Sequence, residues 1–240
     1  MAVDVMAEYR LDKFLTLTGA GTRSQVKELI RKGRVLVNGK PEKRPEKKID
    51  PECDQVSADG KEIRFTKSVY YMLNKPAGVV TATEDRIHRT VIDLLEDKRT
   101  DLFPVGRLDI DTEGLLLITN DGILGHQLLS PKKHVDKTYY VETDLLIPAD
   151  AKERFAAGMD LGDFTAMPAV FEQQGERSGC LTIREGKFHQ VKRMFSAVGT
   201  EVVYLKRLSM GALKLDPSLQ PGESRALTEE EIRLLKGEDV

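Results

Sequence analysis

The chain has 240 residues, enough for one large domain or two modest ones. Apolar residues make up 40% and charged residues 32%, a composition that excludes a disordered or collagen-like chain and predicts a soluble globular protein. No apolar run approaches the roughly 18 residues of a membrane span, and the opening MAVDVMAEYR lacks the pattern of a secretory signal. We therefore expect a cytoplasmic protein that does not associate with a membrane.

The charged residues are unevenly distributed along the chain. The formal net charge is −2, yet the segment 10–48 holds twelve basic residues against four acidic ones. Such an excess within one segment is typical of a module that binds a polyanion, attached to a near-neutral or acidic body. One end of the chain is therefore expected to contact phosphate groups.

Residues 8–64 are predicted to form a small domain of two helices followed by a hairpin. The expected elements are, in order, a helix beginning at Leu11, a helix between Thr22 and Gly33, a strand over 35–37, a turn at Asn38-Gly39 and a strand over 55–57.

One face of the second helix is basic, because cations recur there every three or four residues. A solvated basic face with no ligand is the alternative, but such a face normally interleaves acids, and Glu28 is the only one on this helix. The segments RLDKFL and TRSQVKELIRKGRVLVNGK resemble an S4-type RNA-binding domain, which presents basic residues to structured RNA. This resemblance implies RNA contacts by Arg10, Arg23, Lys27, Arg31, Lys32 and Arg34.

Residues 68–240 are predicted to form a second domain in which short strands and short helices follow no regular alternation. Expected strands cover 70–73, 115–119, 137–141, 180–183 and 202–205. Expected helices lie at 90–95, 123–129 and 188–198. Strands without regular helical crossovers favour an α+β fold with a mixed, mainly antiparallel sheet.

The densest motif is the polar loop GRLDIDTEG, residues 106–114, which leads into an apolar strand. An ionised Asp109 in apolar surroundings can act as a nucleophile or a base. From spacing alone, a turn aspartate that accepts hydrogen bonds from local backbone N–H groups is the commoner interpretation. A glycosidase-like pair of Asp109 with Asp111 is only weakly indicated, because their separation in space is unknown. Tyr139 is suited to stacking on a planar ligand, or else belongs to the core.

The segment REGKFHQVKRM, residues 184–194, places cations and an amide at the start of a helix. These groups suit a phosphate or a carboxylate, with a solvated helix face as the alternative. The four His residues and the two Cys residues lack the spacing of metal ligands, so no metal site is expected. Walker, dinucleotide-binding and nucleophile-elbow motifs are missing, which disfavours nucleotide-driven, dinucleotide and serine-hydrolase chemistry.

Four segments together resemble the RsuA-type pseudouridine synthases: NKPAG (74–78), GRLDIDTEGLLLITNDG (106–122), KTY (137–139) and EGKFHQVKRMF (185–195). The resemblance implies that Asp109 is the catalytic carboxylate and that Tyr139 packs against the target base. It also implies that Lys192 pairs with Asp109, at a position where some relatives have arginine. Further contacts with substrate or RNA are implied for Arg107, Lys75, Gln190 and Arg193.

The implied reaction breaks the N1–C1′ bond of a uridine in RNA, rotates the uracil and rejoins it through C5, with no cofactor and no metal. Length, the S4-like domain and an acidic C-terminal end are most similar to enzymes acting on 16S ribosomal RNA. The expected partner is ribosomal RNA, either 16S rRNA or a small-subunit assembly intermediate, and the expected state is a monomer. Two alternatives stay open: a synthase acting on 23S rRNA, and a non-catalytic RNA-binding or ribosome-assembly protein.

Overall fold

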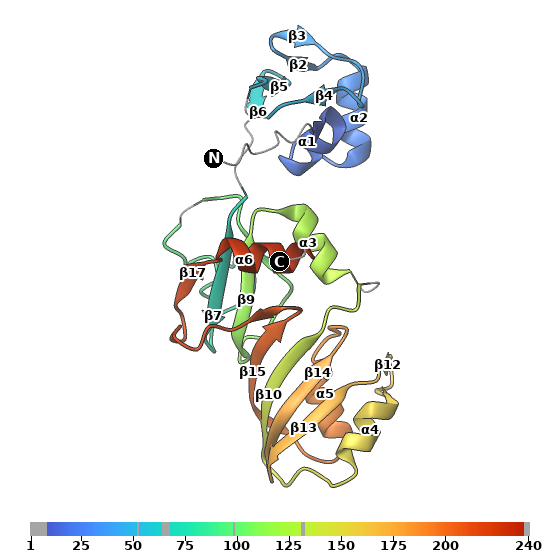
Figure 1. The fold of residues 1–240 in the computed structure, drawn as a ribbon, viewed down its shortest axis with the longest axis vertical. Helices are drawn as coiled ribbons and strands as arrows, with labels where there is room; N and C mark the ends of the chain where they lie inside the picture. The colour runs from blue at the N-terminus through green and yellow to red at the C-terminus, as the bar shows by residue number, and fades with distance from the viewer. Residues whose placement is uncertain (1–8, 52, 64–67, 98, 131–132, 238–240) are drawn as a thin grey trace. The chain divides into compact units, whose positions relative to one another are not determined.

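The structure, a computed structural model, describes residues 9–51, 53–63, 68–97, 99–130 and 133–237. The chain divides into two compact units, Met1–Ser68 and Val69–Val240, each of which is described by itself (Figure 1). The predicted domain limits at residues 8, 64 and 240 lie outside the described residues.

The described part of the first unit combines two helices with short strands. Its elements are β1 (Tyr9–Arg10), α1 (Leu11–Leu17), α2 (Arg23–Arg31), β2 (Val35–Val37), β3 (Lys40–Pro41), β4 (Lys48–Ile49), β5 (Val56–Ala58) and β6 (Lys61–Ile63). Strand β1 pairs with β4, and a separate antiparallel sheet has the order β3-β2-β5-β6. The order of helix, helix and hairpin confirms the predicted S4-like fold.

Local signals explain where the elements of this unit begin and end. Thr22 and Gln25 form a capping box, in which the Thr22 backbone N–H donates to Gln25 Oε1 at 2.9 Å, and helix α2 follows directly. Gly33 has a positive φ of 70°, which reverses the chain after the helix. Asn38 and Gly39 both have positive φ, the requirement of a two-residue hairpin turn between β2 and β3.

The second unit is built on a nine-stranded mixed sheet with helices on both faces (Figure 1). Its elements are β7 (Tyr70–Lys75), β8 (Phe103–Val105), β9 (Glu113–Thr119), α3 (Gly122–Leu129), β10 (Lys137–Thr143), α4 (Ala151–Ala157), β11 (Met159–Asp160), β12 (Thr165–Ala166), β13 (Val170–Gly175), β14 (Ser178–Ile183), α5 (Gln190–Ala197), β15 (Val202–Met210), β16 (Leu213–Lys214), β17 (Ser224–Ala226) and α6 (Glu229–Lys236). Strands β11 and β12 form a separate hairpin.

The main sheet follows the order β13-β14-β10-β15-β9-β7-β17, with β16 beside β15 and β8 beside β9. Strands β9 and β15 pair in parallel, with Gly114 opposite Arg207, whereas the other described strand pairs of this sheet are antiparallel. A Cβ atom at Gly114 would collide with the Arg207 carbonyl oxygen, so this close approach of backbones requires glycine. The predicted α+β class with a mixed, mainly antiparallel sheet is confirmed.

Both faces of the central strand β9 are covered, which explains its uninterrupted apolar run. Leu115 and Leu117 belong to one apolar layer, together with residues of α3 and α6. Leu116 and Ile118 belong to the other layer, together with residues of α4 and α5. All four side chains are fully buried. The layer that contains α5 is also the one that borders the candidate site.

One helix prediction was wrong, and another placed the start of its helix two residues too early. Residues 90–95 form a turn, because the Asp93 carboxylate accepts hydrogen bonds from both the backbone N–H and the hydroxyl of Thr90, at 2.7 and 3.0 Å. Such side-chain bonds compete with helix formation. Helix α5 begins at Gln190 and not at residue 188, because His189 adopts the left-handed conformation with φ 50°.

In the described part of the chain, every helix is too short or too polar to cross a lipid bilayer.

Candidate active site

Asp109 lies in loop 106–112, between β8 and β9. The backbone N–H of Thr112 donates to the Asp109 carbonyl at 3.1 Å, which closes the loop just before β9. On its other side, the Thr81 hydroxyl donates to the Leu108 carbonyl at 2.8 Å and accepts from the Leu108 N–H at 3.2 Å. These bonds fix the backbone, and the Asp109 side chain remains 31% exposed.

The end of strand β7 and the segment after it hold the same loop in place. The Gly78 N–H donates to the Ile110 carbonyl at 2.7 Å. The Lys75 ammonium donates to the carbonyls of Thr112, Pro76 and Ile110, at 2.9, 3.0 and 3.3 Å. The NKPAG segment and the GRLD loop are therefore one hydrogen-bonded unit, although more than thirty residues separate Lys75 from Thr112.

Lys75 has 0% exposure, and its three donors are all used within the protein. Burial lowers the pKa of its ammonium group to about 8. The predicted RNA contact of Lys75 is at odds with this placement, because RNA has no access to the side chain. Lys75 instead supports the backbone that carries Asp109.

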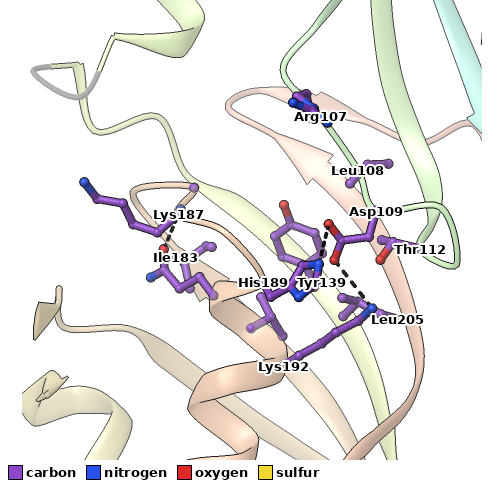
Figure 2. Close-up of a pocket in the computed structure, with 13 residues that line it drawn as sticks. Arg107, Leu108, Asp109, Thr112, Tyr139, Ile183, Lys187, His189, Lys192 and Leu205 are labelled. Atoms are coloured by element: carbon purple, nitrogen blue, oxygen red, sulfur yellow. Dashed lines mark hydrogen bonds and ion pairs between the residues drawn. The ribbon is translucent and has the colours of Figure 1, made fainter. Parts of the chain in front are cut away.

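A pocket opens beside Asp109, and Figure 2 shows the side chains that line it. Its apolar wall includes Leu108, Tyr139 on β10, Ile183 on β14 and Leu205 on β15. Tyr139 is only 7% exposed, and its hydroxyl forms no hydrogen bond with any described residue. An aromatic ring is thus held beside a carboxylate, in surroundings that exclude much of the solvent.

Two cationic or potentially cationic groups from the α5 segment approach Asp109. Lys192 Nζ lies 3.5 Å from Asp109 Oδ2, and His189 Nε2 lies 3.6 Å from Asp109 Oδ1. Lys192 makes closer bonds with Asp111, at 2.7 and 2.8 Å. This hydrogen bond lowers the pKa of the Asp111 carboxyl. Lys192 therefore pairs mainly with Asp111 here, whereas the sequence interpretation paired it with Asp109.

Gln190 and Arg193 hold protein segments in place. The Gln190 amide, 3% exposed, donates to Glu185 Oε1 at 2.9 Å and accepts from the Lys187 N–H at 3.0 Å. Arg193 donates to the Leu161 carbonyl and to the Asp163 carboxylate in the β11–β12 segment. Gln190 still lines the pocket, whereas Arg193 does not. In this geometry neither side chain is free to bind RNA as predicted.

Arg107 and Lys187 are the exposed cations at the pocket rim. Within the described part of the chain, neither side chain forms an ion pair. Figure 2 shows them on different segments at the edge of the pocket, with the Lys187 side chain directed away from Asp109. Both side chains are exposed to an incoming phosphate group, and the RNA contact of Arg107 stays a prediction.

Among the described residues no cluster of three His, Cys, Asp or Glu side chains has a geometry that holds a metal ion.

The predicted RNA-binding cations of the first unit differ in how they are paired. Arg10 makes a two-point contact with Asp12, Lys32 pairs with Glu28, and Arg34 pairs with Asp59. The remaining three are exposed and have no ion-pair partner in the described residues: Arg23, Lys27 and Arg31. These three share one face of α2, which is the part of the basic surface open to a polyanion.

Sequence comparison connects this geometry to a family. The family model described as RNA pseudouridylate synthase matches residues 69–197, and the S4 domain model matches residues 10–56. An uncharacterised RNA pseudouridine synthase of Bacillus subtilis, YtzG, is 50% identical over 233 residues, covering 94% of this chain and 98% of its own. The chain belongs to the RNA pseudouridine synthase family.

Other relatives match the synthase over nearly the same length. Ribosomal small subunit pseudouridine synthase A of Escherichia coli K12 is 44% identical over 228 residues, covering 93% of this chain and 98% of its own. A crystal structure of a pseudouridylate synthase superimposes with a TM-score of 0.71 at 38% identity, covering 94% of this chain and 99% of that one. The predicted family membership and enzyme class are thus confirmed.

Sequence reasoning missed His189 as a site residue of the synthase. It treated the histidines as scattered because it looked for the spacing of metal ligands. The usable signal was the distance in sequence from Lys192, since residues three apart near one helical turn lie on the same side. Both side chains then approach the same carboxylate.

Proposed function

We propose that the synthase converts one uridine of small-subunit 16S ribosomal RNA to pseudouridine, with Asp109 as the catalytic carboxylate. The observation that carries the proposal is the position of the Asp109 carboxylate, beside the buried Tyr139 ring and within 3.6 Å of both Lys192 and His189. Relatives named ribosomal small subunit pseudouridine synthase A, 42–44% identical over almost the whole chain, support the choice of substrate.

The pocket residues account for the steps that the isomerisation needs. The N1–C1′ bond breaks, the uracil rotates, a C5–C1′ bond forms, and the proton on C5 is released while N1 regains one. The Asp109 carboxylate either attacks C1′ or removes the 2′ proton. Lys192 supplies a positive charge beside this carboxylate whether it bonds to Asp111 or turns to Asp109.

Tyr139 holds the detached uracil by stacking, because its ring forms part of the pocket wall. A paired or stacked uridine cannot reach this pocket, so the nucleotide must be flipped out at a cost of a few kcal/mol. Arg107 and Lys187 at the rim suit the flanking phosphates, and the exposed cations of α2 supply binding energy from a separate unit.

The decisive experiment compares the wild-type protein with Asp109→Asn on unmodified 16S and 23S transcripts. Carbodiimide labelling followed by primer extension locates each pseudouridine. We expect one new stop in 16S rRNA with the wild type, none with Asp109→Asn, and equal RNA binding by both. Asp160→Asn, which changes an exposed carboxylate outside the pocket, is the matched control and keeps full activity.

A stop in 23S rRNA alone would refute the proposed substrate and leave the chemistry intact. Turnover by Asp109→Asn would refute the role of Asp109. If neither transcript is modified, the same assay on small-subunit assembly intermediates tests whether the substrate is a ribonucleoprotein.

A further inference from the structure

The turn that precedes helix α5 carries an exposed aromatic side chain at the edge of the pocket. Phe188 is 75% exposed, whereas Phe14, Phe155, Phe171 and Phe195 are at most 2% exposed. Burying such a ring is favourable, so a position that keeps it in water forgoes that gain. The mechanism above assigns no role to this ring.

The exposure of Phe188 is built into the backbone. Gln190 closes the turn on both sides: its N–H donates to the Lys187 carbonyl at 3.1 Å, and its side-chain oxygen accepts from the Lys187 N–H at 3.0 Å. The Gln190 amide is itself anchored to Glu185. His189 adopts a left-handed backbone conformation that non-glycine residues rarely take, and such strain concentrates at functional sites. The turn is therefore rigid.

The Phe188 ring is connected to the catalytic carboxylate through one neighbouring ring. Phe188 and His189 stack with 3.7 Å between ring centroids and 20° between ring planes. The His189 Nε2 atom lies 3.6 Å from Asp109. Since His189 covers one face of Phe188 and the side chain is still 75% exposed, the opposite face is open for a further planar group to extend the stack.

We propose that Phe188, stacked on His189 at the pocket edge, is a stacking platform for the base of an RNA nucleotide next to the target uridine. The inference rests on the proposed function, since it names a specificity contact of the same site. A flat π surface binds any unstacked base, and the neighbours of a flipped nucleotide lose one stacking partner. The rim cations Lys187 and Arg107 provide the charge that the connecting phosphates need.

The test measures kcat and KM by tritium release from 16S and 23S transcripts that carry uridine labelled at C5. Full-length wild type is compared with Phe188→Ala, Phe188→Leu and Phe188→Tyr. We expect a roughly tenfold higher KM for the Ala and Leu variants with kcat within about twofold, and near wild-type values for Phe188→Tyr, which keeps the ring. Leu146→Ala, at a 57% exposed apolar residue outside the pocket, is the control and behaves as wild type.

An unchanged KM for Phe188→Ala would overturn the platform. A wild-type KM for Phe188→Leu would overturn it as well, because leucine offers apolar contact without a π face. Activity of the wild type on 23S rRNA only would refute the proposed substrate. The ratio of the variant KM to the wild-type KM, measured on 23S rRNA, would still decide on the platform. If the wild type modifies neither transcript, filter binding of the 16S transcript decides. A roughly tenfold weaker Kd for Phe188→Ala supports the platform, and an equal Kd overturns it.

Discussion

Replacing Lys75 by methionine tests whether this buried cation supports the loop that carries Asp109. The ammonium donates three hydrogen bonds to backbone carbonyls, and bonds that involve a charged group contribute about 1.5–3 kcal/mol each. Burial of the ammonium group opposes this gain. The fall of the Lys75 pKa from 10.5 to about 8 corresponds to a cost of about 3 kcal/mol for keeping the group charged in the native state. Lys75→Met should therefore lower the free energy of unfolding by about 1.5–6 kcal/mol at neutral pH.

The same pKa predicts how the difference depends on pH. Between pH 8 and 10.5 the unfolded state binds more protons at Lys75 than the native state, so the contribution of this residue to wild-type stability increases with rising pH. From pH 7 to pH 9 that increase is about 1 kcal/mol. Lys75→Met lacks the titrating group, and its deficit relative to the wild type should be larger at pH 9 by that amount.

Urea unfolding followed by tyrosine fluorescence measures both effects. Tyr70, Tyr71, Tyr139, Tyr140 and Tyr204 lie in the second unit and only Tyr9 lies in the first, so the signal reports mainly on the catalytic unit. Lys152→Met, at an exposed position of α4, is the matched control. The kcat of Lys75→Met should also fall by about tenfold or more, because small displacements of a catalytic group are costly. Equal unfolding free energies at both pH values would refute the support role.

Two further perturbations address charge. Asp111→Asn removes the closer partner of Lys192 and leaves Asp109, 3.5 Å away, as the remaining carboxylate for its ammonium group, so kcat at pH 7 should stay within about threefold of the wild type. Tritium release at pH 7 measures this, with Asp163→Asn as control, and a loss of about tenfold or more would contradict it. A triple variant with Arg23→Gln, Lys27→Gln and Arg31→Gln neutralises the free cations of α2. It should reduce the salt dependence of RNA binding, so that the magnitude of the slope of log K against log salt falls by about two to three. Filter binding across a KCl series measures it, Lys152→Gln is the control, and an unchanged slope would show that this face does not bind phosphate.

Short-range features of the molecule were predictable from the sequence. The Thr22 cap, the Gly33 reversal and the Asn38-Gly39 turn act within a few residues, and the structure has each of them in the expected place. The apolar run 115–119 predicted a strand, and it lies within β9. Together with motif order these signals sufficed for the fold class and for the family. The roles of Asp109, Tyr139 and Lys192 stay predictions, which the proposed variants test.

Only the tertiary structure decided which partner each polar side chain takes. Lys75 became a buried support because the loop that carries Thr112 packs directly over it. Lys192 bonds to Asp111, which is 81 residues away in sequence. Phe188 was predicted inside a helix but precedes helix α5, because Gln190 and His189 close a turn before that helix begins. This turn leaves the Phe188 ring exposed. A pattern in sequence records which groups are present, whereas hydrogen bonds and burial depend on distances between segments that only the folded chain brings together.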